Sequence, residues 1–297
     1  MQMKWLEDFV TLAKTRSFTR SAELRNVTHP AFGRRIKALE AWAGMPLIAR
    51  DNQKPLRLTA AGEALLESAD EALRGLRTAK DNMLIAAGKH ERTVVLGTGR
   101  TLARTLVPDM LVRLRTLMND AELQVRTDGL ANVVQLLERG EADFALLYHH
   151  SALAVKLDPR LYTHVSFATD RLVPVARADA QGKPVFTLSD PGPIPYLAYA
   201  PTLAMGRLVS DHLANSPAGP NLVRRVECDS ADAQLEYVQR GLGIGWLPWS
   251  LAQAGCRAGL LAVAGDRKME VRLEIRLSRG KRRLSPVAES IWQRWAK

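Results

Sequence analysis

Cysteine is scarce in this chain of 297 residues, in which Cys228 and Cys256 are the only two. Two isolated thiols supply neither the paired spacing of a metal site nor a disulfide framework. No apolar run approaches the roughly 18 residues of a membrane-spanning helix. Glu7 and Asp8 also interrupt the apolar stretch that a secretory signal would need. We therefore expect a cytoplasmic protein with no metal, no cofactor and no membrane association.

Acidic residues are outnumbered by basic ones, 31 to 42, which gives a net charge of +11. Residues 1–60 contain eleven lysines and arginines against five acidic residues, so a net +6 lies in a fifth of the chain. Such an excess favours a polyanionic partner, although charge alone does not choose between nucleic acid and membrane. Its concentration favours a nucleic-acid-binding N-terminal region. The length predicts two or three domains.

Residues 18–40 are predicted to form two short helices joined by a tight turn at residues 25–27. Thr19 is the expected N-cap of the first helix, because its hydroxyl can accept a hydrogen bond from a first-turn N–H. Thr28 is the expected N-cap of the second helix. Pro30 suits the first turn of that helix, where a missing N–H costs little.

The second of these helices has two unlike faces. Phe32, Ile36 and Leu39 are spaced i, i+4, i+7 and are predicted to form one buried stripe. A short helix with a basic, small-residue face opposite such a stripe is what the DNA major groove admits. The alternative is two ordinary surface helices with a solvated charged face. The residues of the opposite face are His29, Gly33, Arg34 and Lys37.

Further elements flank this pair. Residues 3–15 have apolar side chains at helical spacing and predict a supporting helix. Residues 51–59 are predicted to form a small two-stranded wing. Arg50, which directly precedes it, and Lys54 and Arg57 within it are placed to contact phosphates. Phosphate contacts fix the register on DNA but do not read its sequence.

A long helix is predicted from Thr59 or Ala60 to about residue 87. Its apolar residues alternate spacings of four and three, which is the a/d seam of a coiled coil and favours a dimerising linker helix. The alternative is an amphipathic helix packed within its own chain. The seam residues are Leu65, Ala69, Ala72, Leu76, Ala79 and Met83.

Strands and helices alternate from Thr93 onward, which indicates a parallel α/β sheet in two halves with a cleft between them. The predicted strands cover residues 94–97, 123–127, 144–148, 171–176, 196–199, 224–227, 244–247 and 271–277. The predicted helices cover residues 102–117, 133–138, 203–213, 231–240 and 287–295.

Nearly the whole chain resembles the LysR-type transcriptional regulators. The resemblance is carried by residues 9–40, FVTLAKTRSFTRSAELRNVTHPAFGRRIKALE, and 44–66, GMPLIARDNQKPLRLTAAGEALL. Residues 137–147, LERGEADFALL, and 241–248, GLGIGWLP, add weaker support. The resemblance implies an α/β protein with an all-α winged helix-turn-helix N-terminal domain and a two-lobed, periplasmic-binding-protein-like effector domain.

The resemblance also implies an assembly and its boundaries. Residues 1–59 would bind DNA, residues 60–90 would form the linker helix, and residues 91–297 would bind an effector. Lobe I would take residues of about 91–165 and 270–297, and lobe II those of about 166–269. Homodimers joined through the linker helix would assemble into homotetramers on promoter DNA, and a small molecule would tune the assembly.

The expected DNA contacts depart from the family pattern at two positions. His29 and Gly33 stand where the family usually has Gln and Ser, so base preference is expected to differ. Arg34 matches the family's basic position and is the strongest single candidate. The full expected set is Thr19, Arg20, Thr28, His29, Pro30, Gly33, Arg34, Lys37, Arg50 and Lys54.

Four segments resemble the branch of the family that includes a hypochlorite-responsive regulator: KWLEDFVTL, AMGRL, GIGWLP and SPVAESIW. Met205 lies in the second of these, and in that branch methionine oxidation is the switch. A sulfoxide would place a polar group in an apolar environment. The effector of this chain is therefore expected to be a small molecule or an oxidant, unless Met205 is only a packing residue.

Effector contacts are expected where strands end and helices begin, facing the cleft. Arg100 favours an anionic or polar ligand, or it is a solvated surface residue. His149 and His150 do not predict a metal, because adjacent strand residues point in opposite directions. The expected contacts are Thr98, Gly99, Arg100, Thr101, Asp128, Tyr148, His149, Tyr199, Thr202, Met205, Ser230 and Trp246.

Two other functions compete with a regulator, which is not an enzyme. Gly97, Thr98 and Gly99, followed by Asp128 after the next strand, imitate a dinucleotide-binding fingerprint and would suit a nicotinamide-dependent enzyme. The third glycine is missing, however, and no acid/base pair is placed for hydride transfer. A solute-binding protein without a DNA role would explain the two lobes but not residues 1–60.

Overall fold

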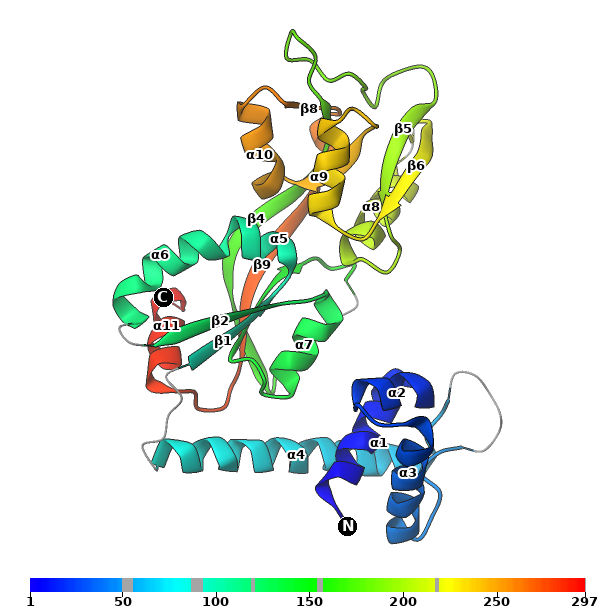
Figure 1. Ribbon diagram of the computed structural model, residues 1–297, viewed down its shortest axis with the longest axis vertical. Coiled ribbons are helices and arrows are strands. Elements are labelled where there is room, and N and C mark those ends of the chain that lie inside the picture. Colours follow the sequence, from blue (N-terminus) through cyan, green and yellow to red (C-terminus); the bar gives the residue numbers. More distant parts are fainter. Residues whose placement is uncertain (50–55, 87–92, 119–120, 154–156, 217–218, 297) are drawn as a thin grey trace. The chain divides into compact units, whose positions relative to one another are not determined.

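The computed structural model describes residues 1–49, 56–86, 93–118, 121–153, 157–216 and 219–296. The chain divides into two compact units, Met1–His90 and Glu91–Lys297 (Figure 1). None of the helices described is both long enough and apolar enough to cross a membrane.

In the described part of the first unit the helices are α1 (Met3–Thr15), α2 (Phe18–Leu24), α3 (His29–Ala43) and α4 (Ala60–Ala86). Their core includes the fully buried side chains of Phe9, Phe32 and Leu39. The stripe expected on α3 is therefore confirmed as buried. An antiparallel bridge between Ile48 and Leu58 marks the predicted wing, and residues 50–55 lie outside the described residues.

The predicted helix starts are half right. Ser17, not Thr19, is the N-cap of α2, and its hydroxyl accepts a hydrogen bond from the Arg20 N–H at 3.3 Å. The apolar Phe18 begins the helix one residue before the predicted cap, so Thr19 is already helical and exposed. Thr28 is the N-cap of α3 as expected, although its side chain makes no capping hydrogen bond.

A buried carboxylate joins three parts of the first unit. Asp8 on α1 has no exposed surface, and it accepts hydrogen bonds from Arg25 Nε at 2.7 Å and Arg35 Nη1 at 3.2 Å. Arg25 follows α2, and Arg35 lies on α3. A buried charge is tolerated only when it is paired, so this cluster fixes α3 against α1.

The apolar side chains of the long helix α4 are buried in its first part and exposed in its later part. Ala69 and Leu73 are buried in the core of the first unit, with Leu65 packed against it. Leu76 is 54% exposed and Met83 is 71% exposed. The first part of the predicted seam thus packs within its own chain, whereas its later apolar residues face solvent.

The second unit is built on a mixed sheet, not the parallel sheet that the alternation predicted. Its strand order is β2-β1-β3-β9-β4-β7, and β8 pairs with β4. Among the described strands of this sheet, the β1–β2 and β1–β3 pairs are parallel, whereas β9 and β4 run antiparallel to their neighbours. The strands are β1 (Thr93–Thr98), β2 (Glu122–Thr127), β3 (Phe144–His149), β4 (Tyr162–Arg177), β7 (Gly245–Pro248), β8 (Leu261–Val263) and β9 (Val271–Gly280).

A second, two-stranded sheet pairs β5 (Ile194–Tyr199) with β6 (Leu222–Cys228) in parallel. The predicted helix over residues 102–117 is divided in two, with Pro108 at the second position of the later helix, where proline is tolerated. The segment after β7 was not predicted to be helical but forms α10. The helices are α5 (Arg100–Thr105), α6 (Val107–Met118), α7 (Leu130–Glu138), α8 (Ala204–Ala214), α9 (Ala231–Gln239), α10 (Trp249–Arg257) and α11 (Pro286–Trp295).

The second unit has a separate core at each end of its long strands. Phe144 and Leu277 belong to one core, which we call the core of lobe I. Leu172, Trp246 and Leu273 belong to the other, the core of lobe II. Strands β4 and β9 contribute to both cores, so they are the continuous connection between the lobes (Figure 1).

Candidate functional site

One face of α3 is free for contact with a partner. Phe32, Ile36 and Leu39 occupy its inner face. The outer face, together with the N-cap, forms what we call the α3 surface. All its residues are exposed except Gly33, which is half-buried, and they are Thr28, His29, Pro30, Gly33, Arg34 and Lys37.

The two adjacent arginines of α3 have different environments. Arg35 is turned toward Asp8 in the interior. Arg34 and Lys37 are exposed, and neither has an ion-pair partner within the described residues. Their charges therefore remain available to an anionic partner.

Other predicted DNA contacts are placed less completely. Thr19 and Arg20 are exposed at the start of α2. His29 is exposed, but its ring also lies against the ring of Phe18, with 5.9 Å between the two ring centroids. A Cβ atom added to Gly33 would meet nothing within 4 Å, so packing does not require glycine there. Arg50 and Lys54 lie outside the described residues.

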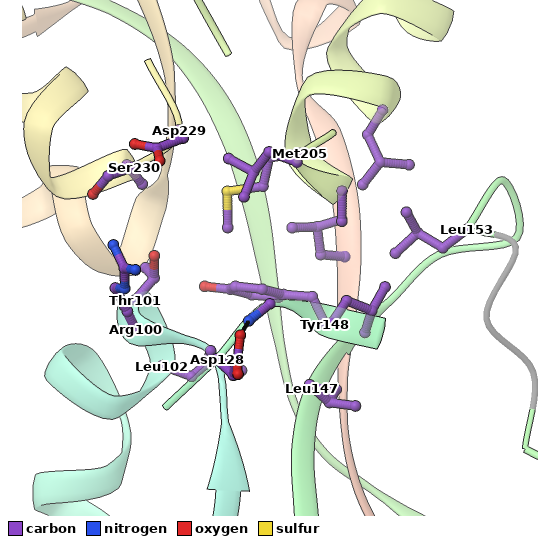
Figure 2. Close-up of a pocket in the computed structure, with 18 of the residues that line it drawn as sticks. Arg100, Thr101, Leu102, Asp128, Leu147, Tyr148, Leu153, Met205, Asp229 and Ser230 are labelled. Atoms are coloured by element: carbon purple, nitrogen blue, oxygen red, sulfur yellow. Dashed lines mark hydrogen bonds between the residues drawn. The ribbon is translucent and has the colours of Figure 1, made fainter. Parts of the chain in front are cut away.

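A pocket with a volume of about 180 Å³ lies between the two lobes of the second unit (Figure 2). Its walls are the ends of strands and the first turns of α5, α7, α8 and α9. Seven of the predicted effector contacts line it, namely Gly99, Arg100, Thr101, Asp128, Tyr148, Met205 and Ser230.

Five predicted contacts do not line this pocket. Thr98 is buried and its hydroxyl donates to the Leu146 carbonyl at 2.8 Å. Tyr199 and Trp246 are buried in the core of lobe II, and the Trp246 indole donates to the Met269 carbonyl. Consecutive residues are buried at the ends of β1 and β5 and throughout β7, so these three side chains are enclosed by the protein and do not reach the pocket.

His149 and Thr202 are also outside the pocket lining. His149 follows Tyr148 on β3 and therefore faces the other side of the sheet, where burial and Arg276 lower its pKa. Thr202 is exposed in the turn before α8. The predicted strand ends and loops do border the pocket, but five of the twelve predicted side chains are turned away from it or lie beyond it.

Sequence reasoning missed most of the apolar lining. Several of these residues lie next to predicted ones in the first turns of helices, so extending each predicted position by one turn would have found them. Leu153 and Leu273 carry no such signal. The missed residues are Leu102, Gly129, Leu130, Leu147, Leu153, Leu203, Ala204, Leu208, Asp229, Ala231, Asp232 and Leu273.

Tyr148 is held in place by a hydrogen-bond network. Its hydroxyl donates to Asp170 Oδ2 at 2.9 Å, and the Ser250 hydroxyl donates to the same oxygen at 2.6 Å. Burial, first of all, and the Asp170 charge raise the pKa of Tyr148. The phenol stays neutral and its hydroxyl is occupied, so Tyr148 offers the pocket chiefly its ring.

Within the described residues, candidate metal ligands and thiols do not form a second site. No group of three His, Cys, Asp or Glu side chains suited to a metal occurs among the described residues. Burial raises the pKa of both Cys228 and Cys256, which keeps them as thiols.

Two family patterns match consecutive parts of the sequence. Residues 3–63 match the bacterial regulatory helix-turn-helix protein, LysR family. Residues 87–296 match the LysR substrate binding domain. The chain belongs to the LysR family.

Similar proteins span nearly the full chain. The HTH-type transcriptional regulator YjiE of Escherichia coli is 27% identical over 99% of this chain and 93% of its own length. Full-length HypT of Salmonella typhimurium, a hypochlorite-specific LysR-type regulator, is 28% identical, with 99% and 96% of the two chains covered and a TM-score of 0.60. Vibrio fischeri DarR in complex with DNA is 28% identical, with 99% and 97% covered and a TM-score of 0.58.

This LysR-family chain is thus a transcriptional regulator with a helix-turn-helix domain and a substrate-binding domain. The fold class expected from the sequence is confirmed, as is the expected DNA-binding function. The α3 surface belongs to the first matched region, and the pocket belongs to the second.

Proposed function

We propose that this regulator reads promoter DNA with the α3 surface and senses a small molecule in the pocket between its lobes. The proposed DNA contact of the α3 surface is supported chiefly by the different orientations of the basic side chains on α3. Arg35 is turned inward to the buried Asp8, whereas Arg34 and Lys37 are presented outward without a partner in the described chain. A helix held rigidly from behind can place its outer side chains accurately on base edges.

The test is binding of the full-length protein to DNA upstream of its own gene, at two salt concentrations. Arg34→Ala is expected to weaken specific binding by about 1–3 kcal/mol and to relax base choice at one position. Lys4→Ala removes an exposed charge from α1 and serves as the matched control. Equal effects of the two substitutions would remove Arg34 from the reading surface.

We also propose that α4 forms a homodimer, and that dimers pair into homotetramers. The support is the apolar stretch at Leu76 and Met83, which is exposed on the single chain. Leu76→Glu is expected to yield monomers in sedimentation experiments, whereas Ser68→Glu, an exposed position outside the seam, should leave dimers. Dimers in both variants would contradict the proposal.

The proposed role of the pocket is sensing in the cytoplasm, not catalysis. The residues that imitate a dinucleotide fingerprint have packing roles in this fold. A Cβ atom at Gly97 would lie 3.0 Å from Val133 Cγ1, and the Thr98 hydroxyl is bound to the Leu146 carbonyl. Bound nicotinamide fluorescence in the purified protein would contradict this role.

An oxidant is a second candidate signal, because Met205 lines the pocket and its sulfur faces the Tyr148 ring (Figure 2). HypT, which is similar to this chain, is hypochlorite-specific. Hypochlorite would transfer one oxygen atom to the thioether and leave as chloride, forming a polar sulfoxide in an apolar lining. DNA binding that changes after hypochlorite treatment, but not in Met205→Leu, would support this candidate. An identical response in Met205→Leu would exclude it.

A further inference from the structure

The pocket between the lobes has unlike sides (Figure 2). Arg100, Thr101, Asp229 and Ser230 lie on one side, and Leu153 lies on the opposite side, with the Tyr148 ring between them. The remaining lining is dominated by leucines from both lobes. A ligand that fills this space must combine an apolar body with a polar head.

Several polar groups of the lining are already satisfied by the protein. Asp128 accepts hydrogen bonds from the Gly129 N–H at 2.6 Å and from Asn132 at 2.9 Å. Asp232 is paired with Arg104 at 2.6 Å. The Ser230 hydroxyl accepts from the N–H of Ala233 at 3.4 Å. These groups, like the Tyr148 hydroxyl, already have partners in the protein, so we do not expect them to bind the polar head of a ligand.

Three polar groups of the lining have no side-chain partner in the described part of the chain: the Arg100 guanidinium, the Thr101 hydroxyl and the Asp229 carboxylate. Thr101 is only 7% exposed as a residue, yet its hydroxyl is not among the fully buried unpaired atoms, so it keeps access to the space of the pocket. A hydroxyl that opens into the pocket can donate a hydrogen bond to a ligand there. Arg100 and Thr101 belong to lobe I, and Asp229 follows β6 of lobe II.

The volume of the pocket limits the apolar body. A protein cavity of about 150 Å³ accommodates one benzene molecule, and this pocket has about 180 Å³. The space therefore suits a branched aliphatic chain of about four carbons or a single aromatic ring.

Resting on the proposed sensing role of this pocket, we propose that its ligand is a zwitterionic α-amino acid with a branched aliphatic or aromatic side chain. The ligand's carboxylate accepts hydrogen bonds from Arg100 and Thr101, and its ammonium group donates to Asp229. The side chain packs on the Tyr148 ring and the leucines. Because its two charged groups bind to different lobes, the amino acid links lobe I to lobe II.

The experiment measures binding to the full-length protein by calorimetry with four probes. Leucine is the complete probe, 4-methylpentanoate lacks its ammonium group, 3-methylbutylamine lacks its carboxylate, and alanine lacks its apolar body. Leucine is expected to bind at least about tenfold more tightly than each of the other three, because each lacks one of the three sets of contacts. Equal binding of leucine and 4-methylpentanoate would overturn the zwitterion assignment.

Substitutions in the protein test which residue binds the carboxylate of the ligand and which binds its ammonium group. Thr101→Val, which keeps the shape of the side chain, should weaken leucine and 4-methylpentanoate alike. Asp229→Asn should weaken leucine about fivefold, the modest effect of an exposed charge, and leave 4-methylpentanoate unchanged. Asp211→Asn, an exposed position on α8 outside the lining, is the control. Equal effects of Asp229→Asn on both probes would overturn the role of Asp229.

Failure of this inference can be told apart from failure of the proposed function. The same samples are tested for specific DNA binding with and without leucine. If the protein bound DNA specifically but calorimetry detected no binding of leucine or, titrated in the same way as a fifth probe, of phenylalanine, the ligand assignment would be overturned and the regulator left unaffected. Loss of specific DNA binding in every sample would count against the reading surface, while calorimetry would still decide the ligand.

Discussion

The α3 surface and the interlobe pocket are built in different ways. The α3 surface comes from one helix of 15 residues and the residue before it, so its spacing alone separates the buried side from the exposed side. The pocket takes residues from four helices and from several strand ends that are far apart in the sequence. A surface on one regular element follows from periodicity, whereas a pocket depends on how elements meet.

The two units should respond separately to loss of their own cores, which is the strongest test of this comparison. Phe32→Ala removes a fully buried ring and should destabilise the first unit by about 3–5 kcal/mol. Specific DNA binding should be lost, and hydrogen exchange should rise in α1–α3 but not in the second unit.

Phe144→Ala provides the reciprocal control, because Phe144 is as completely buried in lobe I. In the Phe144→Ala variant, hydrogen exchange should rise in the second unit alone. Increased exchange in both units after either substitution would show that they unfold together and would contradict independent cores.

The buried Asp8 should matter more than any exposed ion pair. Asp8→Asn leaves Arg25 and Arg35 with a weaker, uncharged acceptor and should lower the free energy of unfolding by about 2 kcal/mol, the value of a hydrogen bond to a charged group. Chemical denaturation measures the change. Glu236→Gln breaks the exposed pair with Arg240 and should change stability by less than about 0.5 kcal/mol. Equal changes would mean that Asp8 does not hold α3.

Gly33→Ala separates folding from recognition on the α3 surface. Alanine finds open space there and should stabilise the helix by about 1 kcal/mol, since glycine is a poor helix former. Thermal denaturation measures that gain. If DNA affinity falls at the same time, the glycine is present for close approach to DNA; unchanged affinity would leave no role for it in recognition.

Acid should weaken lobe I through Glu289. Arg279 donates to both carboxylate oxygens, at 2.6 and 2.9 Å, and this lowers the pKa of Glu289 from its ordinary value of 4.5. A depressed pKa stabilises the fold above the unfolded pKa, and the contribution is lost as the pH falls through the folded pKa. Glu289→Gln should therefore be less stable than wild type near pH 7, with the difference shrinking below about pH 4.5. A difference that is constant with pH would contradict this account.

The sequence predicted the helix-turn-helix well because local signals agree there. The turn at residues 25–27 and the stripe of Phe32, Ile36 and Leu39 are both present as predicted. Only the start of α2 was displaced, because Ser17 and Thr19 are similar candidates for a cap and the packing of Phe18 decides between them.

The amino-acid sequence by itself determined the family, the two-part organisation, the loops that border the pocket and the basic outer face of α3. These depend on neighbours in the chain, since periodicity, caps and charge are local properties. Tertiary structure decided which side of each strand faces the pocket, so that Tyr148 lines it while Tyr199 and Trp246 are buried elsewhere. It also decided that β4 and β9 run antiparallel through both lobes, because strand pairing joins residues about a hundred positions apart and leaves no local pattern.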